Sequence, residues 1–411
     1  MFAKTPFVET RSAHWKLLAA CADLLRRSRP TIALLFALAV PATLPLAHAG
    51  PPIALASEQT RIGLQGAIAT YQALVERGGW GVIPSGRRIE PGDRDARLPA
   101  LRQRLRLTGD YALAEALQAD LYDTDLEAAV RRFQRRHGLL PDGLIGPNTI
   151  EALNVPAAER LAQLHDSLRR TTALSKTAPA GRYVMVNIPA FELQAVRDGN
   201  VELDSVVVIG RRDRQTPEIN ARLTAVNFHP TWHVPASIVR KDLFPRLVAD
   251  PEHFVRQDYR IIRNRDGAEI APAEVARLGL RPHEIRMIRK PGPHNPLGRI
   301  RLDMPNNQAI YLHDSPASAL YMRADRSFSA GCIRVARVVE LSAWLLGQTL
   351  DQESSPITQA LQRKEASTMR LPEPVPVHMV YVTAWVDSDA VVQFREDVYH
   401  LGWGDPNAAG A

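Results

Sequence analysis

The hydrophobic pattern of this 411-residue chain changes its period at Gly181. Before that residue, apolar side chains recur every three or four positions, which predicts helices. After it, apolar and polar residues alternate, first in Tyr183–Ile188, which predicts β-strands. Because a helical stretch is followed by a strand-rich stretch, the sequence predicts a multidomain α+β protein. The length is sufficient for two or three domains.

Four helices are predicted before Gly181, and glycine or proline marks an end of most of them. They are Leu64–Trp80, the segment containing Leu98, Leu101 and Leu105, the segment containing Leu126, Val130 and Phe133, and Pro147–Leu153. Leu161–Ser175 continues as a polar helix and linker.

The strand-rich part is interrupted by a segment with a different pattern, residues 235–293. Helical spacing returns over Ser237–Leu247 and near Pro272–Leu278, with a short hairpin at Asp266–Gly267 between them. We interpret this segment as an ordered insertion in a β domain. The last two predicted strands are Val377–Trp385 and Val391–Tyr399.

A cysteine and a histidine mark the chemistry of the strand-rich part. Cys332 follows the small-residue turn Ser329–Gly331, and His313 lies 19 residues upstream at the end of a strand-like run. A thiol is an effective nucleophile as its thiolate, and a neighbouring imidazole is the usual means of removing its proton at neutral pH. Gly331 permits a tight turn in which backbone N–H groups point at one spot, as an oxyanion hole requires. These residues predict a cysteine acyl-transfer enzyme, with a buried structural cysteine as the alternative.

The wider motif resembles a known active site. His313–Pro316 reads H-D-S-P, and Phe328–Val335 reads F-S-A-G-C-I-R-V. This string is similar to the active-site motif of the L,D-transpeptidases, whose YkuD-type catalytic domain cross-links peptidoglycan. In most of that family a histidine precedes the glycine. This chain has Ala330 there, which resembles the large Gram-negative periplasmic subgroup. The resemblance implies a mostly β catalytic domain in which residues 235–293 cap the active site.

A second resemblance covers residues 129–154, AVRRFQRRHGLLPDGLIGPNTIEALN. This stretch is similar to the three-helix peptidoglycan-binding module found beside many wall enzymes. Its arginines are interpreted either as a solvated helix face or as a surface that docks on glycan or stem peptide; they are Arg131, Arg132, Arg135 and Arg136. The predicted domains are a signal peptide at 1–49, a helical scaffold at 57–95, the binding module at 96–160, a linker at 161–180 and the catalytic domain at 181–411.

The resemblance also implies roles for the residues around the cysteine. Cys332 is expected to be the nucleophile and His313 the general base. The backbone carbonyl of Asp314 orients the imidazole, with the Asp314 carboxylate as a second option. Backbone N–H groups of Gly331 and Cys332 would bind the oxyanion, and Ala330 would contribute a further N–H group.

Three other nearby residues also have expected roles. Arg334 is expected either to hold a substrate carboxylate or to form a structural ion pair. Tyr311 alternates onto the same face as His313 and would line the pocket. Ser329 would either form a hydrogen bond in the site or shape the turn. No metal is expected, because Pro230 and Trp232 between His229 and His233 disfavour a helix that could bring both imidazoles to one zinc ion.

The implied substrate is a peptidoglycan tetrapeptide stem, attacked between diaminopimelate and the terminal D-alanine. The resulting thioester would be resolved by the side-chain amine of another diaminopimelate, giving a 3→3 cross-link without a cofactor. Carbapenem β-lactams are expected to acylate the same cysteine. A non-catalytic wall-binding protein, an L,D-carboxypeptidase and a lipoprotein-anchoring transferase remain alternatives, because the shape of the pocket selects the acceptor.

The first 49 residues have the pattern of a signal peptide. Arg26, Arg27 and Arg29 precede the apolar run Thr31–Val40, and Ala47–Ala49 offers a small-x-small cleavage site. We therefore expect export to the periplasm, with cleavage near Ala49 and no stable membrane span afterwards. An uncleaved membrane anchor is the alternative.

Cysteine content and charge narrow the possible partners. Cys21 lies in the leader, so the mature chain would hold one cysteine and no intrachain disulfide. Removing the leader, with its six basic and two acidic residues, lowers the formal net charge from +7 to +3. Without long basic runs this charge indicates no nucleic-acid partner, although it suits anionic stem peptides.

Overall fold

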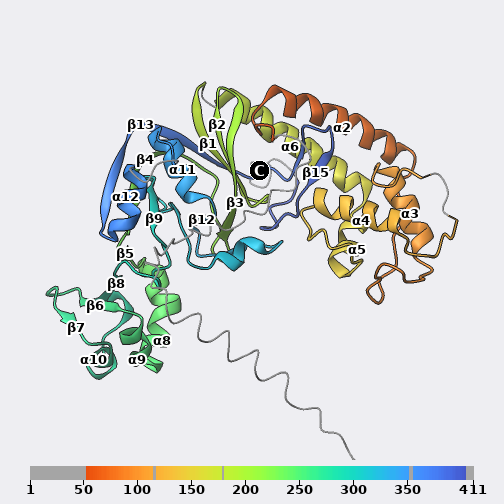
Figure 1. Ribbon diagram of the computed structural model, residues 1–411. Helices are drawn as coiled ribbons and strands as arrows, with labels where there is room; N and C mark the ends of the chain where they lie inside the picture. Colours follow the sequence, from red (N-terminus) through yellow and green to blue (C-terminus); the bar gives the residue numbers. More distant parts are fainter. Residues whose placement is uncertain (1–51, 114–116, 178–179, 351–354, 404–411) are drawn as a thin grey trace, which may run out of the picture. The chain divides into compact units, whose positions relative to one another are not determined.

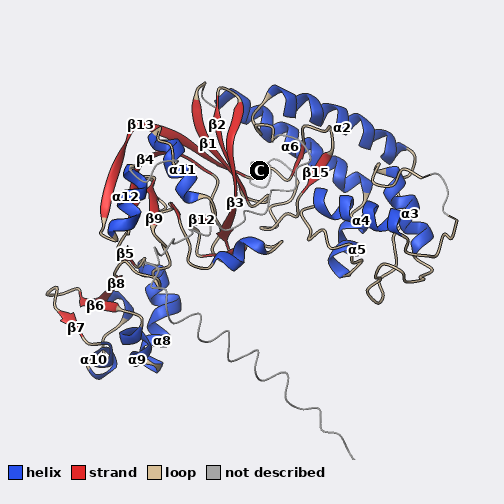
Figure 2. Ribbon diagram, in the orientation of Figure 1, coloured by secondary structure: helices blue, strands red, loops and turns tan. Residues whose placement is uncertain are grey.

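A computed structural model describes residues 52–113, 117–177, 180–350 and 355–403 (Figure 1). The predicted signal peptide, with Cys21, lies outside these residues. In the described residues a helical part precedes a strand-rich part, as Figure 2 shows in blue and red, so the predicted α+β class is confirmed. The helices of the first part are α2 (Glu58–Glu76), α3 (Leu98–Leu107), α4 (Thr124–Arg136), α5 (Pro147–Asn154) and α6 (Ala157–Thr177).

Side-chain caps determine where two of these helices begin. The Ser57 hydroxyl accepts the backbone N–H of Thr60 at 3.1 Å, so α2 starts six residues before the predicted Leu64. At α4, the Asp123 carboxylate accepts the N–H of Leu126 at 2.9 Å. Apolar periodicity located the buried faces correctly, whereas the starting residues depended on polar caps outside the periodic pattern.

Helices α3, α4 and α5 enclose one apolar core that contains the predicted Leu101, Val130 and Phe133. The arginines of α4 require a correction to the interpretation as a solvated face. Arg136 is buried and donates twice to the Asp110 carboxylate, at 2.7 and 2.5 Å. Arg136 therefore has a structural role, and the arginine face of α4 is solvated only in part.

Helix α6 occupies the segment expected to be a polar helix and linker. Gln163 on α6 donates to the carbonyl oxygens of Thr383 and Arg395 at 3.0 and 2.9 Å. The Ser167 hydroxyl accepts the Ala384 N–H at 3.0 Å. These bonds tie the helix to the C-terminal part of the chain. The exact domain boundaries remain predictions.

The strand-rich part is built on a nine-stranded sheet in the order β11-β3-β12-β10-β9-β4-β13-β1-β2. Strands β2 and β3 also pair, so the sheet closes on itself. Apolar side chains inside it form the largest core, covered in part by helices α11 (Val338–Leu346) and α12 (Pro356–Arg363). The strands are β1 (Arg182–Asn187), β2 (Glu192–Arg197), β3 (Asn200–Gly210), β4 (Ile219–Phe228), β9 (Ile300–Asp303), β10 (Leu312–His313), β11 (Ser327–Ser329), β12 (Ile333–Val335) and β13 (Ser367–Val380).

The C-terminal strands differ from the prediction. The segment predicted as one strand, Val377–Trp385, divides after Val380, where β13 ends. The Asn187 side chain accepts the N–H of Val382 at 3.0 Å and donates to its carbonyl at 2.9 Å, replacing the sheet ladder there. The chain then forms a separate hairpin of β14 (Ala384–Val386) and β15 (Val392–Phe394).

The predicted insertion forms a subdomain with its own apolar core, which we call the cap. Its core includes Val239, Leu247, Phe254 and Ile261, all buried. The elements are α7 (Ala236–Ile238), the short π-helix η2 (Val239–Leu243), α8 (Phe244–Ala249), α9 (Pro251–Arg256), α10 (Pro272–Arg277), the 3₁₀ helix η3 (Pro282–Glu284) and a sheet of β5 (Trp232–His233), β8 (Ile285–Arg289), β6 (Tyr259–Arg263) and β7 (Glu269–Ile270).

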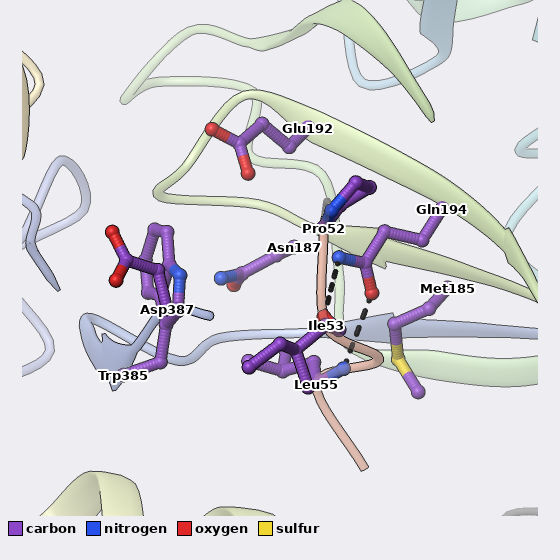
Figure 3. Close-up of a pocket in the computed structure, with 9 residues that line it drawn as sticks. All are labelled: Pro52, Ile53, Leu55, Met185, Asn187, Glu192, Gln194, Trp385 and Asp387. Carbon is purple, nitrogen blue, oxygen red and sulfur yellow. Dashed lines mark hydrogen bonds between the residues drawn. The ribbon is translucent and has the colours of Figure 1, made fainter. Parts of the chain in front are cut away.

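The first described residues run along the sheet beside β2. Figure 3 shows the Gln194 amide bracketing this segment: its nitrogen donates to the Ile53 carbonyl at 3.0 Å, and its oxygen accepts the Leu55 N–H at 3.2 Å. A small pocket forms here, lined also by Glu192 and Asp387. No helix of the described ranges combines the length and the apolarity needed to cross a membrane.

Candidate active site

Parallel pairing of β10 with β12 brings the cysteine and histidine segments together. Leu312 pairs with Ile333, and His313 pairs with Arg334. Leu312 and Ile333 are fully buried in the sheet core. Side chains alternate between faces along a strand, so the neighbours on either side lie on the opposite face. The residues placed on that common face are Tyr311, His313, Cys332 and Arg334.

The imidazole of His313 is held in one tautomer. Its Nδ1 lies 2.6 Å from the backbone carbonyl oxygen of Asp314, which can only accept, so Nδ1 carries the proton. Nε2 is then the unprotonated nitrogen, able to accept a proton. Burial and the nearby charge of Arg334 lower the pKa of His313 to about 3, so the ring is neutral at pH 7.

The Asp314 carboxylate has a different function from its carbonyl. One oxygen accepts the Arg299 N–H at 2.8 Å, and the other accepts the Ser315 N–H at 2.7 Å. Gly298 packs directly beside it, because a Cβ at that position would lie 2.4 Å from an Asp314 oxygen. The carboxylate thus fixes the end of β10 while the carbonyl contacts the imidazole.

Cys332 is a half-buried free thiol. Burial raises its pKa, opposed by the nearby Tyr311 and by the charge of Arg334. The sulfur contacts the Ala309 carbonyl oxygen at 3.8 Å, and no hydrogen bond joins it to His313 in the described structure. The role of His313 as the base that deprotonates Cys332 remains a prediction. At neutral pH the resting pair is a neutral thiol and a neutral imidazole.

Ser329 shapes the turn that carries the cysteine. Its hydroxyl donates to the Cys332 carbonyl at 2.5 Å and accepts the Gly331 N–H at 3.0 Å. Gly331 adopts φ 119°, which is strained for other residues. Because its N–H is occupied, the expectation that Gly331 binds the oxyanion needs revision. In the described residues, the N–H groups of Cys332 and Ala330 donate to no partner.

Arg334 carries a charge without a carboxylate partner among the residues that the structure describes. Its Nη1 lies 3.4 Å from the Ser315 hydroxyl, and its Nε is buried without a hydrogen bond. Burial lowers its pKa. The buried hydroxyl of Tyr321, which interacts electrostatically with Arg334, also lacks a partner. The structural ion pair considered for Arg334 is thus not formed within the described residues, and the guanidinium is available to an anion.

The cap contacts the same region. Tyr311 packs against the apolar core of the cap, and its ring lies 5.7 Å from that of His313. Arg214, in the loop after β3, forms an ion pair with Asp242 of η2 and donates to it at 2.8 Å. The carbonyl oxygens of Arg214 and Gln215 lie beside Gly331. The cap and the cysteine turn therefore share contacts with one loop.

Two contacts of the cysteine turn were not predicted. Thr216 donates from its hydroxyl to the Gly331 carbonyl at 2.7 Å, and its own N–H donates to the Tyr399 hydroxyl at 3.0 Å. No pattern in the sequence singled out Thr216 as a partner of the cysteine turn. Tyr399 was predicted as part of a strand, and nothing local indicated its partner.

The described residues contain no cluster of three metal-ligating side chains. The buried His229 is instead bonded to the Leu361 carbonyl at 3.0 Å, and His233 is exposed. The pocket in Figure 3 includes none of the predicted site residues. The strongest candidate site is therefore the face that carries Cys332, His313 and Arg334.

Comparisons with known proteins point to the same regions. Residues 181–375 match the L,D-transpeptidase catalytic domain, and residues 94–153 match a peptidoglycan-binding domain. A Haemophilus influenzae protein whose name assigns it to the L,D-transpeptidases is 32% identical over 216 residues, covering 53% of this chain. This chain spans only 44% of that relative.

Solved structures are more distant. An L,D-transpeptidase from Xylanimonas cellulosilytica is 16% identical, with 72% of this chain and 99% of that chain covered and a TM-score of 0.23. An L,D-transpeptidase in complex with imipenem is 13% identical, with 49% of this chain and 59% of that chain covered and a TM-score of 0.25.

Proposed function

We propose that this chain is an L,D-transpeptidase that forms 3→3 cross-links in peptidoglycan through a thioester on Cys332, which the match of residues 181–375 to the L,D-transpeptidase catalytic domain supports. The observation that carries the proposal is the common face of β10 and β12. It places a thiol, a neutral imidazole with a free Nε2 and an unpaired guanidinium together. The peptidoglycan-binding domain supports a wall substrate.

In the first step, the sulfur attacks the carbonyl carbon between diaminopimelate and the terminal D-alanine. The side chain of Cys332 turns from the Ala309 carbonyl towards Nε2 of His313, which takes the thiol proton as the S–C bond forms. The C–N bond then breaks, and the same proton passes to the departing amine of D-alanine. Proton transfer during attack suits a pair that is neutral at rest.

The negative charge on the substrate oxygen is met by backbone groups. The N–H groups of Cys332 and Ala330 are the donors that the turn leaves unfilled. Arg334 binds a substrate carboxylate by charge-assisted hydrogen bonds. Preset donors of this kind stabilise the transition state because they do not reorganise as charge develops.

In the second step, the side-chain amine of another diaminopimelate attacks the thioester. A new C–N bond forms, the C–S bond breaks, and His313 removes the proton that the amine loses. The sulfur is released as the thiol. The cap beside the site limits competition from water. The N-terminal 49 residues direct this activity to the periplasm as a cleaved signal peptide.

The decisive experiment incubates the chain without residues 1–49 with a disaccharide-tetrapeptide and analyses the products by mass spectrometry. We expect a dimer with the mass of two substrates minus one D-alanine, and none from Cys332→Ala. A carbapenem should add its mass to the wild-type chain and not to this variant. A circular dichroism spectrum identical to wild type serves as the folding control.

The rival functions give different products. Release of a disaccharide-tripeptide without dimer would identify a carboxypeptidase. Transfer to a lysine-containing lipoprotein peptide in preference to a second stem would identify an anchoring enzyme. Binding to isolated wall material with no product and no carbapenem adduct would refute catalysis and leave a wall-binding protein.

A further inference from the structure

The peptide unit between Gly331 and Cys332 is held from one side. Thr216 donates to the carbonyl oxygen of this unit at 2.7 Å. A trans peptide directs its C=O and N–H in opposite directions, so the Cys332 N–H points away from Thr216. Ser329 occupies both the Gly331 N–H and the Cys332 carbonyl. The Cys332 N–H is thus the unfilled donor beside the sulfur.

Hydrogen bonds also hold Thr216 itself in place, through its hydroxyl and its backbone N–H. It is 2% exposed, and its hydroxyl accepts the Gly210 N–H at 2.9 Å. Its backbone N–H donates to the Tyr399 hydroxyl, which in turn donates to the Gly210 carbonyl at 2.8 Å. A Cβ on Gly210 would lie 2.1 Å from the Arg214 carbonyl oxygen, so only glycine allows this close packing.

The C-terminal segment completes the support. The Tyr399 N–H donates to the Tyr381 hydroxyl at 2.9 Å, and that hydroxyl donates to the Asp397 carboxylate at 2.5 Å. Tyr381 and Tyr399 are both buried, with ring centroids 5.7 Å apart. These residues lie beyond residue 375, where the match to the catalytic domain ends. A segment outside that match therefore braces the cysteine turn.

We propose that Thr216 is a positioning residue for the oxyanion-binding N–H of Cys332, and that Tyr399 holds Thr216 in place. The inference rests on the proposed function, because it assigns Thr216 a part in forming the thioester. With its carbonyl already bonded, the Gly331–Cys332 peptide cannot rotate as charge develops on the substrate oxygen. The bond to the carbonyl also polarises the N–H of the same unit.

The test separates oxyanion binding from thiol reactivity. Thr216→Val, Thr216→Ser and Tyr399→Phe are compared with wild type in two reactions: acylation of Cys332 by a carbapenem, and alkylation by iodoacetamide across a pH series. Alkylation requires the thiolate but forms no oxyanion. Removing one oxyanion-hole donor lowers the rate about 100- to 1000-fold. A donor that is still present but no longer held in position should lower the rate less.

We expect Thr216→Val to slow acylation about 10- to 100-fold while the alkylation rate changes less than about twofold at every pH of the series. Thr216→Ser, which keeps the hydroxyl, should stay within about threefold of wild type, and Tyr399→Phe should fall between the two.

Three outcomes would overturn the positioning role. Thr216→Val could acylate at the wild-type rate, both reactions could fall in parallel, or Thr216→Ser could be as slow as Thr216→Val. A wild-type chain that is alkylated by iodoacetamide but acylated by neither carbapenem nor tetrapeptide would instead refute the proposed function, and the inference with it.

Discussion

The binding module and the candidate site each contain an arginine beside a buried histidine, and the arginine is buried in the module and half-buried in the site. In the module these are Arg136 and His137; in the site they are Arg334 and His313. Both histidines place Nδ1 against a backbone carbonyl, at 2.8 and 2.6 Å. Burial lowers the pKa of both imidazoles, and the adjacent arginine adds to the effect. By residue type and by the direction of the histidine pKa shift the two pairs are alike.

They differ in what remains unpaired. Burial of Arg136 is more than offset by Asp110, which raises its pKa, and the His137 ring stacks on Phe133 at 3.8 Å. Arg334 has no such carboxylate in the described chain, and its pKa is lowered. A shifted pKa alone therefore does not identify an active site. An unpaired charge beside a nucleophile is the more specific sign.

The largest expected effect comes from breaking the paired arginine. Arg136→Met leaves Asp110 buried without its cation, which should lower the free energy of unfolding by about 3–5 kcal/mol. Urea denaturation followed by circular dichroism measures it. The exposed neighbour Arg135→Met is the matched control, expected within about 0.5 kcal/mol of wild type. A loss below about 1 kcal/mol for Arg136→Met would contradict a structural role for this pair.

Removing the unpaired arginine, Arg334, should affect activity rather than stability. Arg334→Met is expected to lower kcat/KM for the tetrapeptide about 100-fold, since a hydrogen bond to a charged group contributes about 1.5–3 kcal/mol. Its free energy of unfolding should stay within about 1 kcal/mol of wild type, because the substitution leaves no buried charge without a partner. Steady-state kinetics and urea denaturation give the two values. Arg323→Met is the control, because Arg323 is an exposed arginine in the segment between β10 and β11. An equal loss of kcat/KM in both variants would contradict a specific role for Arg334.

The smallest effect concerns acid stability. Unfolded imidazoles titrate near pH 6.5, whereas the pKa of His137 is lowered by burial in the fold. Between these pKa values the unfolded chain binds more protons, so this contribution to stability is lost as the pH falls below about 6.5. His137→Phe should reduce the slope of stability against pH by up to about 1.4 kcal/mol per pH unit. Urea denaturation between pH 7 and 4.5 measures it, and an unchanged slope would mean that the folded imidazole is charged.

Local patterns in the sequence predicted the parts that short-range chemistry determines. The apolar faces of α3 and α4, the inserted cap and the turn before Cys332 were all readable in this way. Long-range partners were not. Asp110 lies 26 residues from Arg136 along the chain, and Tyr399 lies 183 residues from Thr216. Hydrogen bonds of this range leave no periodicity in the sequence.

Burial also changed the expected chemistry. The neighbouring residues predicted an imidazole that ionises the thiol, but both groups are desolvated and neutral at rest. The Gly331 N–H, free in principle, is taken by Ser329 because that hydroxyl lies within the same turn. A motif specifies which groups are present, while the packing decides which of them stay free.

Strand β12 lies between β10 and β3, within a sheet that closes on itself. If the thioester forms as proposed, the enzyme is for that interval covalently joined to a wall that is stretched by osmotic pressure. Tension then enters the fold at Cys332 and is carried along β12 to neighbours bonded on both edges. To pull the strand free, the load must break two hydrogen-bonded ladders at once, so the covalent intermediate is anchored in a mechanically resistant part of the protein.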